Sequence, residues 1–343
     1  RRSGHPGVDM SRAVSAVVLA LAVVSGEASG VEILRSTGGL AADVVGLLRE
    51  PAAFQRSPDG SYLVLDRRGH VVYRVSGSGT NATKIVQIGP ESGRIIGPST
   101  FVLAGSRFLV ADAPGQRERV QLFDLDGTRV SGFWLPGRAT PRITIGGLTL
   151  SGVSSLQWTG RSILMSQPEL GGLMTEFTVG GQPYRTFGVF RTTGHEADRD
   201  VHLALNSGLP LVDPTGGYYF VFQAGLPVFR KYDADGRLLF ERHIEGPELD
   251  ALIQSVPTTW PRHVDQTGRA LPLIPPTVRA AAVAPNGDLW VSLRVPYTYV
   301  YDRKGEKVRT VQFHAAGTVS PDSLFFESRD RLLVTPGCYI FTV

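Results

Sequence analysis

The stretch Val283–Phe313, VAPNGDLWVSLRVPYTYVYDRKGEKVRTVQF, decides the fold that this sequence predicts. Its pattern indicates three strands joined by two turns, because short apolar runs alternate with polar segments that contain glycine. Asn286-Gly287 predicts a two-residue type I′ hairpin turn, since both central positions of that turn need a positive φ, which Asn and Gly adopt at low cost. The second turn is expected at Asp302, Lys304 and Gly305.

Side-chain alternation within this stretch predicts which strands are buried. Tyr297, Tyr299 and Tyr301 fall on one face of their strand, because successive side chains of a strand point to opposite faces. The following strand, KVRTVQF, carries Lys307 and Arg309, and charged side chains are typical of an outer, edge-like strand. The stretch therefore predicts an antiparallel module with a buried middle and an exposed outer strand.

The same module recurs along the chain, and six copies are the best count, with five or seven as the alternatives. The two turn glycines are 18 to 22 residues apart in four modules, whereas the first glycines of successive modules are 45 to 71 residues apart. Insertions therefore accumulate between modules, which is typical of stacked supersecondary repeats. The turn glycines are Gly60, Gly105, Gly127, Gly160, Gly181, Gly216, Gly236, Gly287 and Gly305.

The two ends of the chain favour a propeller over a solenoid. The last module, residues 320–343, supplies three strands, and the N-terminal strand VEILRS (31–36) has no local partner. If this strand completes the last module, the repeats close into a ring without open sheet edges. Second strands such as YYFVF (218–222) are apolar on both faces, as expected for blades that pack between neighbours. We predict an all-β, six-bladed β-propeller closed by the N-terminal strand.

The repeated turns carry a resemblance to a known family. A P-[DN]-G turn, a short apolar strand and a Φ-x-Φ-D-x-x-G turn recur as SPDGSYLVLD, APNGDLWVSL, YVYDRKG and FRKYDADG. This pattern resembles the six-bladed propellers of the NHL and TolB-like superfamily over residues 31–343. The resemblance implies the fold and leaves function open, because the superfamily holds ligand and protein binders, lactonase-like calcium hydrolases, and lyases of amidated or cyclic peptides.

Composition restricts the class of protein. The 343 residues include 40 Gly, 23 Pro and 42% hydrophobic side chains, which is typical of a turn-rich chain that forms a core. Lys and Arg are scattered without a run of five, so nucleic acid or anionic membrane binding is not supported. Cys338 is the only cysteine, which excludes an internal disulfide and a CxxC site; we expect a small buried residue near the end of the last strand rather than a reactive thiol.

The N-terminal residues 1–30 are interpreted as an upstream extension followed by a secretory signal. Met10 precedes a short basic segment with Arg12, an apolar run at residues 13–24 and small residues at 28–30. The apolar run is shorter than the roughly 20 residues that a membrane-spanning helix needs. The alternative is an N-terminal core or anchor helix. We expect a periplasmic or secreted protein, with residues 31–343 forming a single propeller domain.

The working site of a propeller is expected at the central channel and its mouth. The side chains near the innermost strands are polar and nearly all neutral, and neither an acid nor a His is expected among them. The lactonase-like members imply carboxylates for calcium and the lyases imply several His, so this departure argues against metal-dependent catalysis. The channel-mouth binding candidates are Gln55, Ser99, Thr100, Ser154, Ser155, Asn206, Ser207, Arg279 and Ser323, together with Trp260 from an insertion.

The densest ionisable cluster, HEADRDVH, lies between the third and fourth modules. Its weak metal-ligand candidates are His195, Glu196, Asp198, Asp200 and His202. No spacing here matches an established zinc or EF-hand pattern, so a solvated loop with Arg199 neutralising the acids is the favoured interpretation. The Asp124-Leu-Asp126-Gly and Asp233-Ala-Asp235-Gly segments are expected to be hairpin turns rather than calcium loops, since neither continues to a Glu at the twelfth position.

The largest departure from the repeat is the insertion at residues 246–278. Pro247 at a helix start and apolar Leu249, Leu252, Ile253 and Val256 predict a short amphipathic helix that ends before Pro257. The insertion is either a cap over one rim or a lid that shapes a pocket at the channel mouth.

These observations predict a non-enzymatic module that binds an unidentified protein or small molecule through its channel mouth and inter-blade loops. We expect no cofactor, with calcium as the alternative. The rival function is a metal-dependent hydrolase or lyase of the lactonase-like or NHL-lyase kind.

Overall fold

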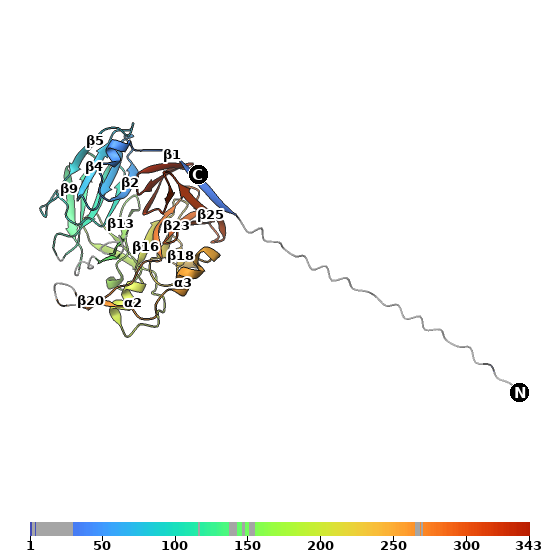
Figure 1. Ribbon diagram of the computed structural model, residues 1–343. Coiled ribbons are helices and arrows are strands. Elements are labelled where there is room, and N and C mark those ends of the chain that lie inside the picture. The colour runs from blue at the N-terminus through green and yellow to red at the C-terminus, as the bar shows by residue number, and fades with distance from the viewer. Residues whose placement is uncertain are drawn as a thin grey trace.

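The computed structural model describes residues 1, 4, 30–115, 117–136, 143–145, 148–150, 155–264, 268 and 270–343. The expected signal segment and Ser154 lie outside these residues, apart from positions 1, 4 and 30. Twenty-four strands arrange in six four-stranded blades around a central axis, as the sequence predicted (Figure 1). The innermost strands contact one another in order, and β27 of the last blade contacts β2 of the first, so the ring is closed.

Each blade is an antiparallel sheet whose strands follow one another along the chain, except that the outermost strand of blade six is β1. From the innermost strand outward, blade one is β2 (Pro51–Arg56), β3 (Tyr62–Asp66), β4 (Val71–Val75) and β5 (Ala82–Val86). Blade two is β6 (Thr100–Ala104), β7 (Arg107–Asp112), β8 (Arg119–Asp124) and β9 (Arg129–Trp134). Blade three is β12 (Leu156–Trp158), β13 (Ile163–Met165), β14 (Met174–Phe177) and β15 (Pro183–Phe187).

The second half of the ring follows the same order. Blade four is β16 (Gly208–Val212), β17 (Tyr218–Phe222), β18 (Val228–Tyr232) and β19 (Leu238–His243). Blade five is β22 (Val278–Val283), β23 (Leu289–Leu293), β24 (Thr298–Tyr301) and β25 (Lys307–His314), with the short β26 (Thr318–Val319) beside β25. Blade six is β27 (Ser323–Ser328), β28 (Arg331–Thr335), β29 (Tyr339–Thr342) and β1 (Val31–Gly39). Two hairpins lie outside the blades: β10 (Ile143–Ile145) with β11 (Leu148–Leu150), and β20 (Arg262–Val264) with β21 (Ala270–Pro272).

The core is divided among the interfaces between neighbouring blades. Each of the six interfaces has its own cluster of buried apolar side chains, and each blade contributes to the clusters on both of its sides. This arrangement explains the second strands, because β3, β17 and β23 are buried at every position. Tyr299 and Tyr301 lie together in the cluster between blades four and five, as the alternation predicted.

Strand β1 closes the ring by joining two blades. Residues 31–35 pair in parallel with Thr310–His314 of β25, and residues 36–39 pair antiparallel with β29, with a register shift between Ser36 and Gly38. The closure expected from the sequence is confirmed, but the edge-like position expected for KVRTVQF was wrong. The charges there serve the closure, since Arg309 donates to both carboxylate oxygens of Glu32 at 2.7 and 2.8 Å.

The hairpin turns differ from the expected geometry. Gly287 has φ +91°, but Asn286 does not have a positive φ, and the Gly287 amide donates to the Ala284 carbonyl at 2.9 Å. The turn is therefore a four-residue turn that ends on a left-handed glycine, and the two-residue type I′ turn was wrong. The same amide bond and positive φ recur at Gly60, Gly127, Gly181, Gly216, Gly236 and Gly305. The two calcium-like segments are thus hairpin turns, as predicted.

Short helices lie outside the blades and only partly match the prediction. The expected helix at residues 41–49 is limited to α1 (Ala42–Val45). The expected loop HEADRDVH contains the start of α2 (Arg199–Leu205), since Asp198 accepts a hydrogen bond from the Val201 amide and caps the helix. The 3₁₀ turn η1 spans Pro168–Leu170. In the insertion, the 3₁₀ turn η2 (Pro247–Leu249) leads into α3 (Asp250–Gln254).

Cys338 lies in the turn before β29 rather than near the end of that strand. Its side chain is fully buried, and burial raises the pKa of the thiol to about 12. The thiol therefore stays protonated at neutral pH and packs as a small apolar group.

Candidate functional site

The polar candidates on the innermost strands tie neighbouring blades together. Gln55 of β2 accepts a hydrogen bond from the Leu103 amide of β6 at 2.9 Å, which joins blades one and two. Ser155 donates to the Pro210 carbonyl of blade four at 3.4 Å. Ser323 lies 2.7 Å from the Thr335 hydroxyl within blade six, and Thr100 is the first residue of β6. Hydrogen bonds within the protein therefore use much of the hydrogen-bonding capacity of the side chains that were predicted to bind a ligand.

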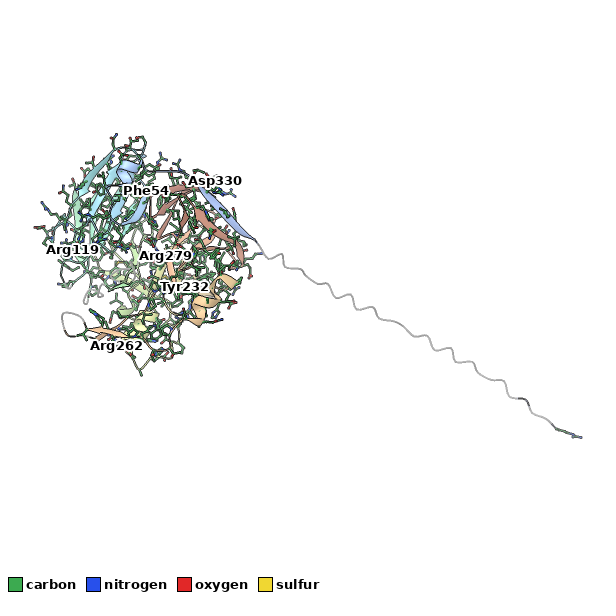
Figure 2. The ribbon with its side chains drawn as sticks, in the orientation of Figure 1. Phe54, Arg119, Tyr232, Arg262, Arg279 and Asp330 are labelled. Carbon is green, nitrogen blue, oxygen red and sulfur yellow. The ribbon has the colours of Figure 1, made fainter. Side chains whose placement is uncertain are left out.

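Arg279 is not an isolated charge near the channel. Its Nε donates to Asp322 Oδ1 at 3.0 Å, and its Nη2 bonds the same oxygen. Asp322 directly precedes β27, so this ion pair joins blades five and six, and Figure 2 shows Arg279 near the middle of the ring. The expectation of no acid near the innermost strands was wrong, because Asp322 lies there. The carboxylate is neutralised by a guanidinium, and a paired carboxylate is a poor start for a calcium site.

The other candidates gather where α2 meets the insertion. The His195 ring contacts the Trp260 ring edge to face with centroids 5.0 Å apart, and Arg262 of β20 forms an ion pair with Asp198. Trp260 packs against an apolar cluster made by Val201, Leu205, Ala224 and Ile274. We call α2, Trp260 and the β20–β21 hairpin the α2 platform.

Arg191 and Asn206 hold the α2 platform on blade four. Asn206 is fully buried, accepts from the Arg191 amide at 2.9 Å and donates to the Arg191 carbonyl at 3.3 Å. The Arg191 guanidinium donates to the carbonyls of Leu205 and Leu226 at 2.9 and 2.8 Å, and it lies 4.2 Å from the Phe222 ring centroid. Burial lowers the pKa of Arg191 to about 10, so it remains charged at neutral pH. Asn206 is therefore a structural support rather than a ligand-binding group.

The HEADRDVH side chains form two groups, Glu196 with His202 around Thr193 and Asp198 with Arg262. Glu196 accepts from the Thr193 and Gly194 amides at 2.8 and 3.2 Å, and these bonds lower the pKa of its carboxyl. The His202 Nδ1 lies 2.8 Å from the Thr193 hydroxyl, whereas Asp198 pairs with Arg262. Asp200 also has an interaction partner. Among the described residues, no group of three or more His, Cys, Asp or Glu side chains could hold a metal ion. The donor set that the lactonase-like or lyase members imply does not fit these residues.

The insertion divides into a helical part and a hairpin part. Leu249 is fully buried in the cluster between blades four and five, where Leu252 and Ile253 also pack. Tyr299 donates to Glu248 at 2.5 Å, which fixes η2 on blade five. The hairpin lies apart, beside α2 at the lower edge of the ring in Figure 1. The start of the insertion therefore packs between blades four and five, whereas its central β20–β21 hairpin lies outside the blades.

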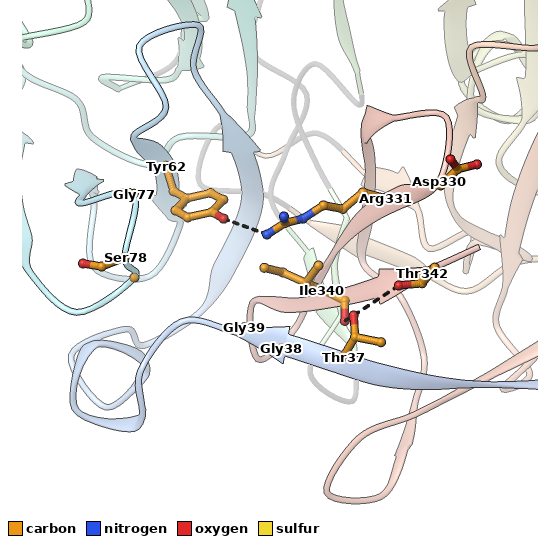
Figure 3. A pocket seen from close by; sticks show the side chains of 11 residues that line it. Thr37, Gly38, Gly39, Tyr62, Gly77, Ser78, Asp330, Arg331, Ile340 and Thr342 are labelled. Carbon is orange, nitrogen blue, oxygen red and sulfur yellow. Dashed lines mark hydrogen bonds between the residues drawn. The ribbon is translucent and has the colours of Figure 1, made fainter.

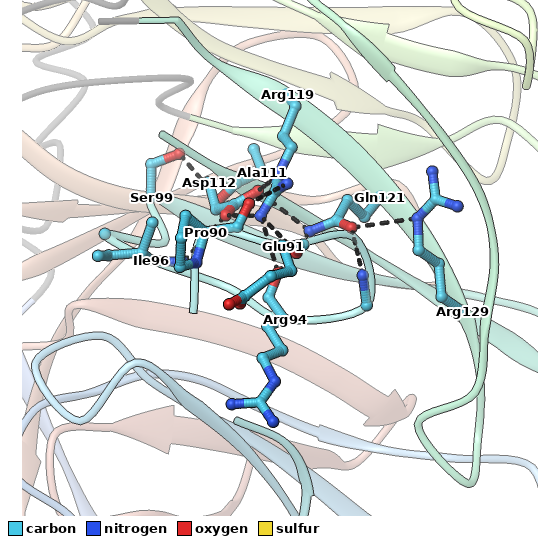
Figure 4. A network of polar contacts seen from close by, with 12 residues as sticks. Pro90, Glu91, Arg94, Ile96, Ser99, Ala111, Asp112, Arg119, Gln121 and Arg129 are labelled. Carbon is cyan, nitrogen blue, oxygen red and sulfur yellow. Dashed lines mark hydrogen bonds and ion pairs between the residues drawn. The ribbon is translucent and has the colours of Figure 1, made fainter. Parts of the chain in front are cut away.

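A buried polar network on blade two holds the loop that connects β5 to the innermost strand β6. Arg119 donates to both carboxylate oxygens of Asp112 at 2.8 and 2.9 Å, and to the carbonyls of Pro90, Glu91 and Arg94 (Figure 4). Asp112 also accepts from the Ile96 amide at 3.0 Å. Because Arg119 and Asp112 are both buried, we interpret this network as a structural clamp on residues 90–96.

The described residues also form a polar cavity whose lining includes none of these candidates. The cavity, about 490 Å³ in volume, lies between blade six and blade one, and it was not predicted from the sequence. Its walls come from five separate segments, namely residues 37–39, Tyr62, residues 77–79, residues 330–331, and Ile340 with Thr342, so no local motif could have identified it. No described helix is long and apolar enough to span a membrane.

Comparison with known proteins identifies the fold alone. No protein-family model matches the sequence, and no curated protein matches it. A virginiamycin B lyase from Staphylococcus aureus superimposes with a TM-score of 0.53 at 9% identity, covering 86% of this chain and 95% of that one. A protein of unknown function from Bacteroides thetaiotaomicron gives 0.51 at 12% identity, with 86% and 70% coverage. A gluconolactonase from Xanthomonas campestris gives 0.49 at 13% identity, with 91% and 97% coverage.

The chain is a six-bladed β-propeller. At such low identity, the likeness to a lyase transfers neither an activity nor a set of catalytic residues to this propeller.

Proposed function

We propose that this propeller is a secreted or periplasmic NHL/TolB-like module that binds a partner protein or ligand, without catalysis, through its channel mouth and inter-blade loops. The α2 platform carries the proposal. Two segments about 60 residues apart in sequence fold into one projection with its own apolar cluster, although ring closure does not require it. Loops placed by a rigid scaffold are where propellers and other β proteins bind their ligands.

The exposed side of the platform combines charged and apolar groups. Arg262, His263 and Val264 of β20 are exposed, and Val264 is 60% exposed. Val189, two residues before Arg191, and Leu226, whose carbonyl accepts from Arg191, are 83% and 51% exposed. Apolar groups among charged ones are typical of a protein interaction surface, which supports binding of a protein at this end of the molecule.

A shortened hairpin tests this proposal without disturbing the core. Replacing residues 264–270 with Asn-Gly would connect His263 to Leu271, which already face each other in the β20–β21 register, through a two-residue turn. Residues 247–249 must stay, because Leu249 is part of the core between blades. The parent and the variant are immobilised and exposed to the native periplasmic or secreted fraction, and captured proteins are quantified by mass spectrometry.

We expect a species that the parent captures and the variant loses, while both unfold at the same temperature. A second variant, Val264→Ser, tests whether the apolar contact contributes. If a folded shortened variant captures every species as well as the parent does, the platform is not the binding surface.

Secretion is a separate part of this proposal and has its own test. Residues 10–30 fused to a reporter enzyme should direct it out of the cytoplasm of the native host, and replacing the apolar run at residues 13–24 with polar residues should retain it there. Export of the polar variant would contradict the proposal.

A further inference from the structure

The cavity between blades six and one is lined mainly by hydrogen-bonding groups. Four hydroxyls face it, and glycine backbone forms much of the remaining wall, with Ile340 as an apolar side chain (Figure 3). The hydroxyls belong to Thr37, Tyr62, Ser78 and Thr342, and the glycines are Gly38, Gly39, Gly77 and Gly79. Its volume, about 490 Å³, lies within the range of small-molecule sites.

The polar groups of the cavity are held in place by contacts from both blades. Arg331 donates to the Tyr62 hydroxyl at 3.2 Å, and its Nε lies 3.0 Å from Glu327. Thr37 donates to the Ile340 carbonyl at 3.3 Å and lies 3.5 Å from the Thr342 hydroxyl. These contacts fix the directions of Arg331, Tyr62 and Thr37 before any ligand arrives, and this preorganisation lowers the cost of binding.

The charge balance of the cavity favours a neutral ligand. Arg331 supplies only donors and Asp330 supplies acceptors, and Figure 3 shows the Asp330 carboxylate pointing away from the Arg331 guanidinium. A simple anion would compete with Glu327 for Arg331, and a simple cation would meet the Arg331 guanidinium, so neither fits both Arg331 and Asp330. A molecule with several hydroxyl groups satisfies both, because each hydroxyl donates one hydrogen bond and accepts others.

We propose that this cavity is a binding site for a neutral polyhydroxylated molecule, namely a mono- or disaccharide or a sugar alcohol. The cavity includes Asp330, in the turn that follows the innermost strand β27. The α2 platform instead comes from segments that precede the innermost strands β16 and β22 in the chain. The cavity is therefore separate from the platform surface proposed above. Its occupancy and the function of the platform can therefore be tested independently.

Gly38 offers a way to close the cavity without removing a hydrogen-bonding group. A Cβ at Gly38 would meet no atom within 4 Å, whereas a Cβ at Gly39 would lie 2.8 Å from the Cys338 carbonyl oxygen. Gly38 also lacks a positive φ, so a larger residue adopts its backbone without strain. Gly38→Trp should fill the cavity, and Gly38→Ala is the matched control.

Saturation-transfer difference NMR of the full chain tests the proposal with glucose, galactose, N-acetylglucosamine, maltose and glycerol as probes. Acetate, phosphate and ethylamine serve as charged probes of similar size. We expect at least one sugar to bind the parent and Gly38→Ala, to lose at least tenfold in affinity in Gly38→Trp, and to bind more tightly than any charged probe. Thr342→Val should weaken the sugar severalfold, whereas Thr83→Val, on the exposed strand β5, should not.

Three results would overturn the proposal. They are the absence of binding by every sugar and by glycerol, tighter binding of acetate, phosphate or ethylamine than of the sugars, and sugar binding that persists in a folded Gly38→Trp variant. The unfolding temperature of each variant, measured in parallel, distinguishes loss of binding from loss of fold.

Discussion

Glu176 is the residue at which the packing of two blades depends most on charge. Its side chain is fully buried between blades three and four, where it accepts hydrogen bonds from Ser162 and Tyr218 at 2.8 and 2.9 Å and also pairs with Tyr184 and Arg185. Burial raises the pKa of this carboxyl, but the four hydrogen bonds outweigh burial and hold the pKa below its ordinary value. A lowered pKa means that the folded state favours the charged form.

We expect Glu176→Gln to destabilise the fold by about 3 kcal/mol at pH 7, because the partly buried Arg185 would keep its charge beside a fully buried site that no longer holds an anion. The parent should lose stability as the pH falls below about 4.5 toward the lowered pKa, and the variant should lose less over that interval. Urea unfolding at pH 7 and across the acid range measures both effects. The control is Glu169→Gln, which breaks the exposed pair with Arg199 and should cost less than about 1 kcal/mol. Equal losses in the two variants would contradict this prediction.

At the residue scale, the sequence predicted which residues are buried better than it predicted which side chains form ion pairs. The buried cysteine and the buried face of tyrosines follow from local pattern. The pairs Arg279–Asp322 and Asp198–Arg262 do not, because their members are 43 and 64 residues apart and meet only in the folded chain, the first pair between two blades and the second between α2 and the β20–β21 hairpin. For this reason Arg279 was predicted as a binding residue without its partner Asp322.

The hairpin turn is the element that recurs most regularly, but its glycines differ in how closely they pack against neighbouring atoms. Gly60 and Gly127 have nearly the same φ, +86° and +90°. A Cβ at Gly60 would approach no atom closer than 3.7 Å, whereas a Cβ at Gly127 would lie 2.1 Å from the carbonyl oxygen of Ile85, in the neighbouring blade. The turn at Gly127 therefore both reverses the chain and packs against blade one.

We expect Gly60→Ala to cost about 1 kcal/mol, the strain of a left-handed backbone alone. Gly127→Ala should cost at least twice as much, because the blade interface must also move. Urea unfolding of both variants measures the difference. A loss at Gly127 no larger than that at Gly60 would show that the turn does not contribute to the interface.

Element positions followed closely from sequence, while turn type and helix extent did not. The glycine positions were sufficient to locate each hairpin, yet a type I′ turn and a four-residue turn ending on glycine share the Asn-Gly signal. Helix α2 escaped prediction because its charged residues suggested a solvated loop, whereas its buried side chains Val201 and Leu205 face the insertion, which comes about 50 residues later.

At the scale of the whole molecule, the sequence predicted ring closure from an unpaired strand and an incomplete module. It did not predict that β1 would be shared between two blades. The change from parallel to antiparallel pairing near Ser36 allows one strand to cover the outer edge of β25 and then that of β29. The cavity is lined by five segments from the first and last blades, so it depends on the same closure and could not be predicted from any single stretch of sequence.

Removing Val31–Gly39 should open the ring at both of these edges. We expect the unfolding temperature to fall by more than about 10 °C and the protein to self-associate as its concentration rises, because β25 and β29 would present unpaired backbone groups. Differential scanning calorimetry and analytical ultracentrifugation measure the two effects, and a synthetic peptide of residues 31–39 should restore the parent's behaviour by occupying the same edges. A variant that lacks only residues 1–29 should keep the parent's oligomeric state and unfolding temperature. If the two deletions behave alike, closure depends on the inter-blade clusters and on ties such as Arg56–Glu327 and Arg279–Asp322, with β1 as a dispensable cover.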